Sequence, residues 1–174
     1  MTDRPNYVTP AGFAAMRARY QHLLSDERPK LVEVISWAAG NGDRSENGDY
    51  IYGRKRLREI DGELGWLSKR MKSARVVDPA NQTERDKVLF GATVTIADED
   101  DAQRTLTLVG EDEADASAGR ISWRSPIAFA LRGAAVGDVR RVELPGGAKD
   151  YEVLEIGYPD ADKKAGAPPR THPD

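Results

Sequence analysis

Three carboxylates stand close together in the segment Gly42-Asp43-Arg44-Ser45-Glu46-Asn47-Gly48-Asp49, which holds the side chains best suited to chemistry in this sequence. Carboxylate oxygens are the hard ligands that Mg²⁺ prefers, and this ion usually takes only one or two of them from a protein. Asp43 and Glu46 could therefore hold a metal ion weakly by themselves, or complete a site whose other ligands belong to a partner.

Asp43 and Glu46 also fit a structural interpretation. An Asp followed three residues later by Glu is a variant of the capping box, which satisfies the first backbone N–H groups of a helix. Carboxylates also suit a helix N-terminus because of its partial positive charge. The two interpretations are compatible, since a capping box can also fix the positions of the carboxylates.

A run of positive charge follows, formed by Arg54, Lys55, Arg56 and Arg58. Such a run is usually a solvated helix face. It could also contact a nucleic-acid backbone, because phosphate contacts need positive charge and little else. An acidic turn with a basic patch about 10–15 Å further along one helix is an unusual arrangement for solvation alone.

Two predicted helices flank the turn. The second helix has eight residues at alternating spacings of three and four, which is the period of a left-handed coiled coil. These residues are Tyr50, Gly53, Leu57, Ile60, Leu64, Leu67, Met71 and Ala74. Two helices joined by so short a turn must pack antiparallel. Each has about 30 residues, so at ~1.5 Å per residue the hairpin is ~45 Å long and should protrude.

The first helix should start with Thr9 as its N-cap and Pro10 at its first position. Pro29 removes one helix hydrogen bond, so we expect a kink there. Beyond it the apolar stripe resumes one residue out of phase. Gly40-Asn41-Gly42 should end the helix. Gly53, Gly62 and Gly65 add glycines inside the second helix, where each costs ~0.5–1 kcal/mol relative to Ala.

Short strands are predicted in the second half of the chain. Residues 93–96, 105–109 and 120–122 alternate as strands do, and residues 139–144 should pair with 151–156 across Pro145-Gly146-Gly147. Ser125-Pro126 should start a brief helix. The predicted fold class is α+β, with a coiled-coil hairpin at 1–79, a mostly antiparallel β domain with a short helix at 80–158, and a disordered tail at 159–174.

Composition excludes several functions. The 174 residues contain no Cys and only His22 and His172, which argues against thiolate zinc sites, a Cys nucleophile and a Ser-His-Asp triad. No stretch approaches the ~18 apolar residues that span a bilayer, and no signal peptide is apparent. We therefore expect a cytoplasmic protein. Residues 1–79 hold 14 Lys and Arg against 11 Asp and Glu, whereas residues 80–174 hold 12 against 18. This difference in sign predicts two modules with different surfaces.

A series of motifs follows one order along the chain. It includes Asn6-Tyr7-Val8-Thr9-Pro10-Ala11-Gly12-Phe13, Glu27-Arg28-Pro29, Trp37-Ala38-Ala39, Gly42-Asp43-Arg44-Ser45-Glu46-Asn47, Asp49-Tyr50-Ile51-Tyr52, Lys55-Arg56-Leu57-Arg58-Glu59-Ile60-Asp61, Phe90-Gly91-Ala92, Ile121-Ser122, Ser125-Pro126 and Val136-Gly137-Asp138. This series covers roughly residues 6–158 and resembles the bacterial Gre transcript cleavage factors, in the GreB branch rather than GreA.

The resemblance implies a coiled-coil hairpin followed by an FKBP-like domain, and a partner, RNA polymerase, bound in its secondary channel. Two hairpin-tip acids, matching Asp43 and Glu46, would help to position Mg²⁺ and water in the polymerase active centre. The polymerase would then cleave the nascent RNA 3′ end in backtracked complexes. A basic patch matching Arg54, Lys55, Arg56 and Arg58 would lie along this RNA. Such a factor is not an enzyme itself, and we expect a monomer.

Ser125-Pro126 is our expectation for the edge of the polymerase-docking surface, although the same pair is a common helix start. Two other functions remain open. One is a channel-binding regulator that does not stimulate cleavage, against which the intact Asp43/Glu46 pair argues. The other is an FKBP-like prolyl isomerase, whose pocket would need several aromatic side chains. The second half offers Phe90, Trp123, Phe129, Tyr151 and Tyr158, scattered along the sequence.

Overall fold

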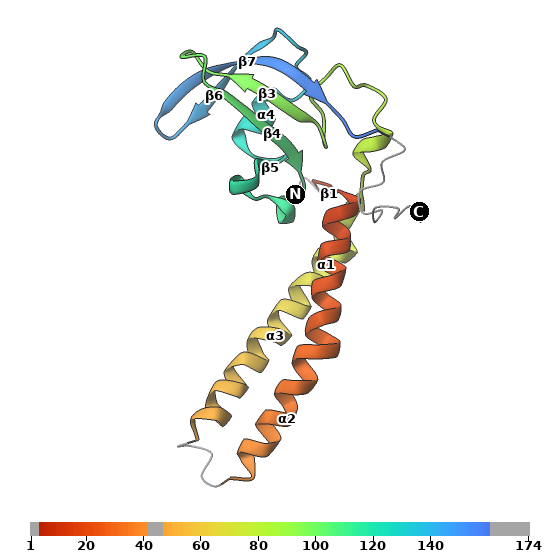
Figure 1. Cartoon of the computed structure of the whole chain (residues 1–174), viewed down its shortest axis with the longest axis vertical. Helices are drawn as coiled ribbons and strands as arrows, with labels where there is room; N and C mark the ends of the chain where they lie inside the picture. Colours follow the sequence, from red (N-terminus) through yellow and green to blue (C-terminus); the bar gives the residue numbers. More distant parts are fainter. Residues whose placement is uncertain (1–3, 42–46, 161–174) are drawn as a thin grey trace, which may run out of the picture. The chain divides into compact units, whose positions relative to one another are not determined.

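The computed structural model describes residues 4–41 and 47–160, and its elements form two compact units (Figure 1). One unit is Phe13–Ala74, and the other combines the described residues before and after it. The sequence placed residues 1–79 in the hairpin, whereas the contacts group the segment before Phe13 with the second half of the chain. No helix of the described residues is both long and apolar enough to cross a membrane.

The first leg of the hairpin is helical from end to end but has one irregular turn. It consists of α1 (Pro10–His22), a π-helical turn at Leu23–Glu27, and α2 (Arg28–Ala39). The Arg28 N–H donates to the Leu23 carbonyl five residues back, so this turn holds one extra residue. That extra residue explains why the apolar stripe slips by one position just before Pro29.

The second leg is α3 (Gly48–Ser73), a helix of 26 residues that runs antiparallel to α2 (Figure 1). Gly53, Ile60 and Leu67 are buried, and the other predicted members of the stripe are half-buried. The predicted stripe is therefore the packed face of the helix. Its last member is the exception, because α3 ends at Ser73 and Ala74 is already extended.

Gly53 lies on the face of α3 that packs against α2. A Cβ atom at this position would lie 2.7 Å from Cγ1 of Ile35, which is closer than real Cβ contacts. Gly62 and Gly65, by contrast, face open space. The glycine at 53 thus permits close helix packing, whereas nothing in the structure explains the other two.

The second unit is built on a five-stranded sheet with the order β5-β4-β3-β7-β6. Its strands are β3 (Thr93–Ala97), β4 (Gln103–Val109), β5 (Arg120–Ser122), β6 (Val139–Leu144) and β7 (Gly147–Gly157). All neighbours are antiparallel except β4 and β5. The short helix α4 (Pro126–Leu131) joins them in one apolar core. The predicted α+β class is confirmed.

Two short strands were not predicted. β1 (Asn6–Val8) pairs with β2 (Ala74–Val76), and the Val77 N–H extends the pairing to the Val8 carbonyl at 2.8 Å. The segment after them begins with a 3₁₀ turn at Pro79–Asn81 in which Ala80 is buried. Most of the expected tail, from residue 161 onward, lies outside the described residues.

The Gly53 contact predicts an asymmetric response to one substitution made at two sites. Gly53→Leu should lower the free energy of unfolding by about 1–3 kcal/mol, because the larger side chain overpacks against Ile35. Gly62→Leu, the same change on an open face of the same helix, should be neutral or stabilising. Thermal unfolding followed by the helical circular dichroism signal measures both. Equal effects at the two sites would contradict the packing role of Gly53.

Candidate functional site

The described residues on both sides of the predicted tip are anchored to each other. Asn47 is the N-cap of α3: its side-chain Oδ1 accepts from the Tyr50 N–H at 3.2 Å. Its Nδ2 atom donates to the Ala38 carbonyl in the last turn of α2 at 2.7 Å. One amide side chain therefore starts the second helix and ties it to the end of the first.

This cap corrects the structural interpretation of the turn. The sequence pattern allows Asp43 as the N-cap and Glu46 as its capping-box partner, whereas in the structure α3 begins four residues later and uses Asn47. Asn is as good a cap as Asp, so the local sequence offered two competing starts. Asp43 and Glu46 themselves lie outside the described residues. The cap of α3 does not require either carboxylate.

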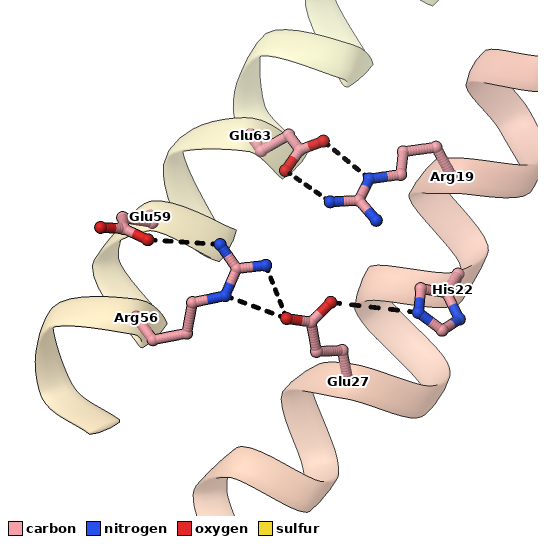
Figure 2. Close-up of polar contacts among 6 residues, drawn as sticks. All are labelled: Arg19, His22, Glu27, Arg56, Glu59 and Glu63. Atoms are coloured by element: carbon pink, nitrogen blue, oxygen red, sulfur yellow. Dashed lines mark hydrogen bonds and ion pairs between the residues drawn. The ribbon is translucent and has the colours of Figure 1, made fainter. Parts of the chain in front are cut away.

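The basic run divides into two groups because of its position around the helix. Arg56 turns toward the first leg of the hairpin, where its Nη2 and Nε atoms donate to Glu27 of the π-helical turn at 2.6 and 2.9 Å (Figure 2). Its Nη1 atom donates to Glu59 on α3 at 3.2 Å. The hydrogen bonds to Glu27, and then those to Glu59, raise the pKa of the Arg56 guanidinium above its usual value. Its side chain is only 28% exposed.

Arg54, Lys55 and Arg58 differ from Arg56. All three are exposed, and within the part of the chain that the structure describes they form no ion pair. Arg54 lies over the Tyr50 ring, 5.9 Å from its centroid. The sequence-predicted basic patch therefore has three cations available to a partner, whereas Arg56 is engaged within the hairpin.

Further ion pairs join the two legs of the hairpin. Arg19 donates to Glu63 at 2.8 and 3.1 Å (Figure 2), and Arg28 donates to Asp61 at 2.9 Å. The hydrogen bond from Arg19 lowers the pKa of Glu63. Exposed pairs of this kind contribute ~0.2–1 kcal/mol each. Together with Arg56 they fix how the two legs align along their length.

Large apolar side chains are exposed close to the basic run. Trp37 near the end of α2 is 65% exposed, and Ile51 and Tyr52 in the first turns of α3 are 53% and 68% exposed. All three stand within the motifs of the family resemblance but were not predicted to be exposed. For Ile51 and Tyr52 the exposure could be predicted, because both lie outside the stripe of three and four spacings that forms the packed face of the second helix.

A second candidate surface surrounds Ser125 and Pro126. The Ser125 hydroxyl accepts from the Ala128 N–H at 3.3 Å and caps α4, with Pro126 at the first helical position, as predicted for a helix start. Phe129 on the same helix is 70% exposed. The Arg132 guanidinium lies over both Trp123 and Phe129, at 5.1 and 5.7 Å from the ring centroids. We call Ser125, Pro126, Phe129 and Arg132 the α4 surface.

Aromatic side chains of the second unit are less scattered than their spacing suggested. Phe90 and Trp123 pack edge to face, with centroids 6.2 Å apart, and Tyr7 contacts both. The rings of this cluster are packed against each other.

Among the described residues, no group of three or more His, Asp or Glu side chains is arranged to hold a metal ion.

Comparison with known proteins covers nearly all of the described chain. The family model "Transcription elongation factor, N-terminal" matches residues 6–76, and "Transcription elongation factor, GreA/GreB, C-term" matches residues 82–158.

Individual relatives extend over the same length. The transcription elongation factor GreB of Neisseria meningitidis serogroup B is 45% identical over 157 residues, which are 90% of this chain and 96% of the relative. GreA of Alkalilimnicola ehrlichii is 39% identical over 152 residues, 87% and 96% of the two chains. The crystal structure of GreA factor homolog 1 (Gfh1) of Thermus thermophilus overlaps with a TM-score of 0.41 at 18% identity, covering 88% and 99%. On the two family matches and the identity to these elongation factors, the chain belongs to the GreA/GreB family of transcription elongation factors.

Proposed function

We propose that this chain binds bacterial RNA polymerase in its secondary channel and stimulates cleavage of the RNA 3′ end in backtracked complexes. The observation that carries this proposal is the match of both GreA/GreB family models, over residues 6–76 and 82–158, in a chain that keeps the acids Asp43 and Glu46. In this function the chain is not an enzyme; it activates hydrolysis by the polymerase. We infer that it acts as a monomer in the cytoplasm.

Asp43 and Glu46 are the residues that would hold Mg²⁺. Their carboxylates are the oxygen donors that this ion prefers, and two of them leave the shell incomplete, so the remaining ligands must come from the polymerase, RNA or water. When bound, the ion would stabilise the attacking and leaving oxygens of phosphodiester hydrolysis. The hairpin would position these acids, because Asn47 and Gly53 hold the adjoining ends of α2 and α3 close together.

The remaining surfaces support binding to the elongation complex. Arg54, Lys55 and Arg58 supply positive charge for the extruded RNA, because phosphate contacts are mainly electrostatic. The α4 surface offers an exposed aromatic ring beside a cation, a combination that is enriched at protein interfaces. We infer that Ser125 and Pro126 form part of the docking surface for polymerase and that Phe129 contributes most of its apolar area.

Asp43→Asn tests the role of the tip acids. The substitution should leave polymerase binding unchanged but lower the rate of RNA shortening in a stalled, backtracked complex by at least 10–100-fold, the approximate loss seen when groups that only orient metal ligands are removed. Asp49→Asn, which changes the third carboxylate of the segment, is the matched control and should retain cleavage. A wild-type chain that binds polymerase without shortening RNA would instead indicate a channel-binding regulator.

The divided basic run predicts that its members act differently. The double variant Arg54→Ala/Lys55→Ala should weaken action on long backtracks and flatten the dependence of binding on salt, since fewer counterions are released. It should change the free energy of unfolding by less than ~0.5 kcal/mol. Arg56→Ala should instead lower that free energy by about 1 kcal/mol, because Glu27 and Glu59 lose their shared partner. The rate of RNA cleavage is measured against factor concentration at several salt concentrations, and thermal unfolding measures the stability of each variant. Together these experiments distinguish an RNA contact from a structural role. An unchanged salt dependence in the double variant would reject its RNA contact.

Phe129→Ala tests the α4 surface. Burying a Phe side chain contributes ~1.5–3 kcal/mol, so its loss should weaken binding to polymerase by about tenfold or more while leaving thermal stability unchanged. Val76→Ala removes another half-exposed apolar side chain of the same unit and serves as the control. Fluorescence-anisotropy titration of a labelled factor with polymerase measures both affinities. Equal affinities of wild type and Phe129→Ala would place the docking surface elsewhere.

A further inference from the structure

Tyr52 is the most exposed aromatic side chain of the hairpin, and it is not part of the packed face of α3. Among the residues that the structure describes, its ring contacts no other ring or cation, and its hydroxyl has no hydrogen-bond partner. Tyr50, two residues earlier, shows the contrast: it belongs to the packed stripe, its N–H bonds to Asn47, and Arg54 covers its ring. Tyr52 therefore exposes its ring on the surface of the hairpin and makes none of the contacts that hold Tyr50 in place.

Helix geometry places Tyr52 beside Lys55 and Arg56, the cations three and four residues further on. Gly53 faces α2, so Tyr52 lies ~100° around the helix from the packed face. Lys55, three residues on, lies ~4.5 Å further along the same side, and Ile51, Lys55 and Arg58 follow one row at spacings of four and three. The side of α3 that carries Tyr52 thus also presents Lys55, while Ile51 and Arg58 lie further around the outer face and Arg54 lies on the opposite side from Tyr52.

We propose that Tyr52 is a stacking platform for a base of single-stranded RNA, with Lys55 and Arg58 contacting the phosphates beside that base. The inference deepens the proposed function and rests on it for the presence of RNA along the hairpin. Aromatic rings interleaved with positive charge are how proteins hold single strands without reading their sequence, since every base has a π face. This suits a factor that must accept whatever transcript has been extruded.

Charge favours RNA over a protein surface as the occupant. An apolar groove of a protein would have to desolvate Lys55 beside the ring, and Arg58 further around the helix, without compensation, because these cations have no acidic partner within the described chain. The phosphates of a single RNA strand supply negatively charged partners for these cations at short intervals along the hairpin. The neighbouring carboxylates Glu27 and Glu59 are engaged by Arg56 and so repel the strand less.

The test uses polymerase complexes backtracked on RNA that carries photoreactive 4-thiouridine in its extruded segment. Tyr52→Leu keeps an apolar side chain but removes the ring, and it should lower crosslinking to the factor and raise the factor concentration for half-maximal cleavage by about 5–10-fold. Tyr52→Phe, which keeps the ring, should stay within about twofold of wild type. Trp66→Leu, at another exposed aromatic residue of α3, should match wild type. Because Tyr52→Leu removes no charge, the salt dependence should keep its slope.

Three results would overturn the inference. Tyr52→Leu could crosslink to RNA as well as the wild type does, or Trp66→Leu could be as impaired as Tyr52→Leu. Tyr52→Leu could also lose as much affinity for polymerase without nucleic acid as it loses for the backtracked complex. The last result would mean that the ring contacts polymerase. Failure of the proposed function is distinguishable, since it would appear as a wild-type chain that does not stimulate cleavage. The crosslinking comparison decides the stacking role in that case as well.

Discussion

The close approach of α2 and α3 at their distal ends is the constraint on which the candidate site depends. It rests on the missing side chain of Gly53, which lets Ile35 pack against the α3 backbone, and on Asn47, which bonds to both helices. Both ends of the segment 42–46 are thereby joined to residues fixed on each other. A short acidic segment can position a metal only if its ends are held, because fixing one residue's backbone costs ~1–2 kcal/mol of conformational entropy.

Helix periodicity assigns different tasks to adjacent residues in the same basic run. Arg56 lies next to the packed stripe and reaches Glu27 on the other leg, so it aligns the hairpin. Lys55 and Arg58 lie on the outer face with Tyr52, where a nucleic-acid strand can approach. Four cations within five residues therefore need not form one patch, because the ~100° step between residues turns Arg56 toward the other leg and Lys55 and Arg58 outward.

Much of this arrangement follows from local pattern alone. The three-and-four stripe of α3, the alternating strands β3 and β4, and the Ser125 cap of α4 depend on nearest neighbours in sequence, which is why they could be predicted. Three features could not. β1 and β2 are three-residue strands whose pairing joins residues nearly seventy positions apart. In the sequence, the π-helical turn before Pro29 is visible only as a one-residue shift of the apolar stripe. The partner of Arg56 is set by tertiary packing, so composition could not separate Arg56 from Arg54.

The position of the α3 cap changes how the acids Asp43 and Glu46 should be understood. As a capping box, they would be explained by local stability alone, and their chemistry would be incidental. With Asn47 as the cap, the Tyr50 N–H at the start of α3 is satisfied without them. Two like charges close together in the sequence repel one another, and a bound cation would offset that repulsion. The role proposed for the two acids, holding a metal ion jointly with polymerase, would supply that cation.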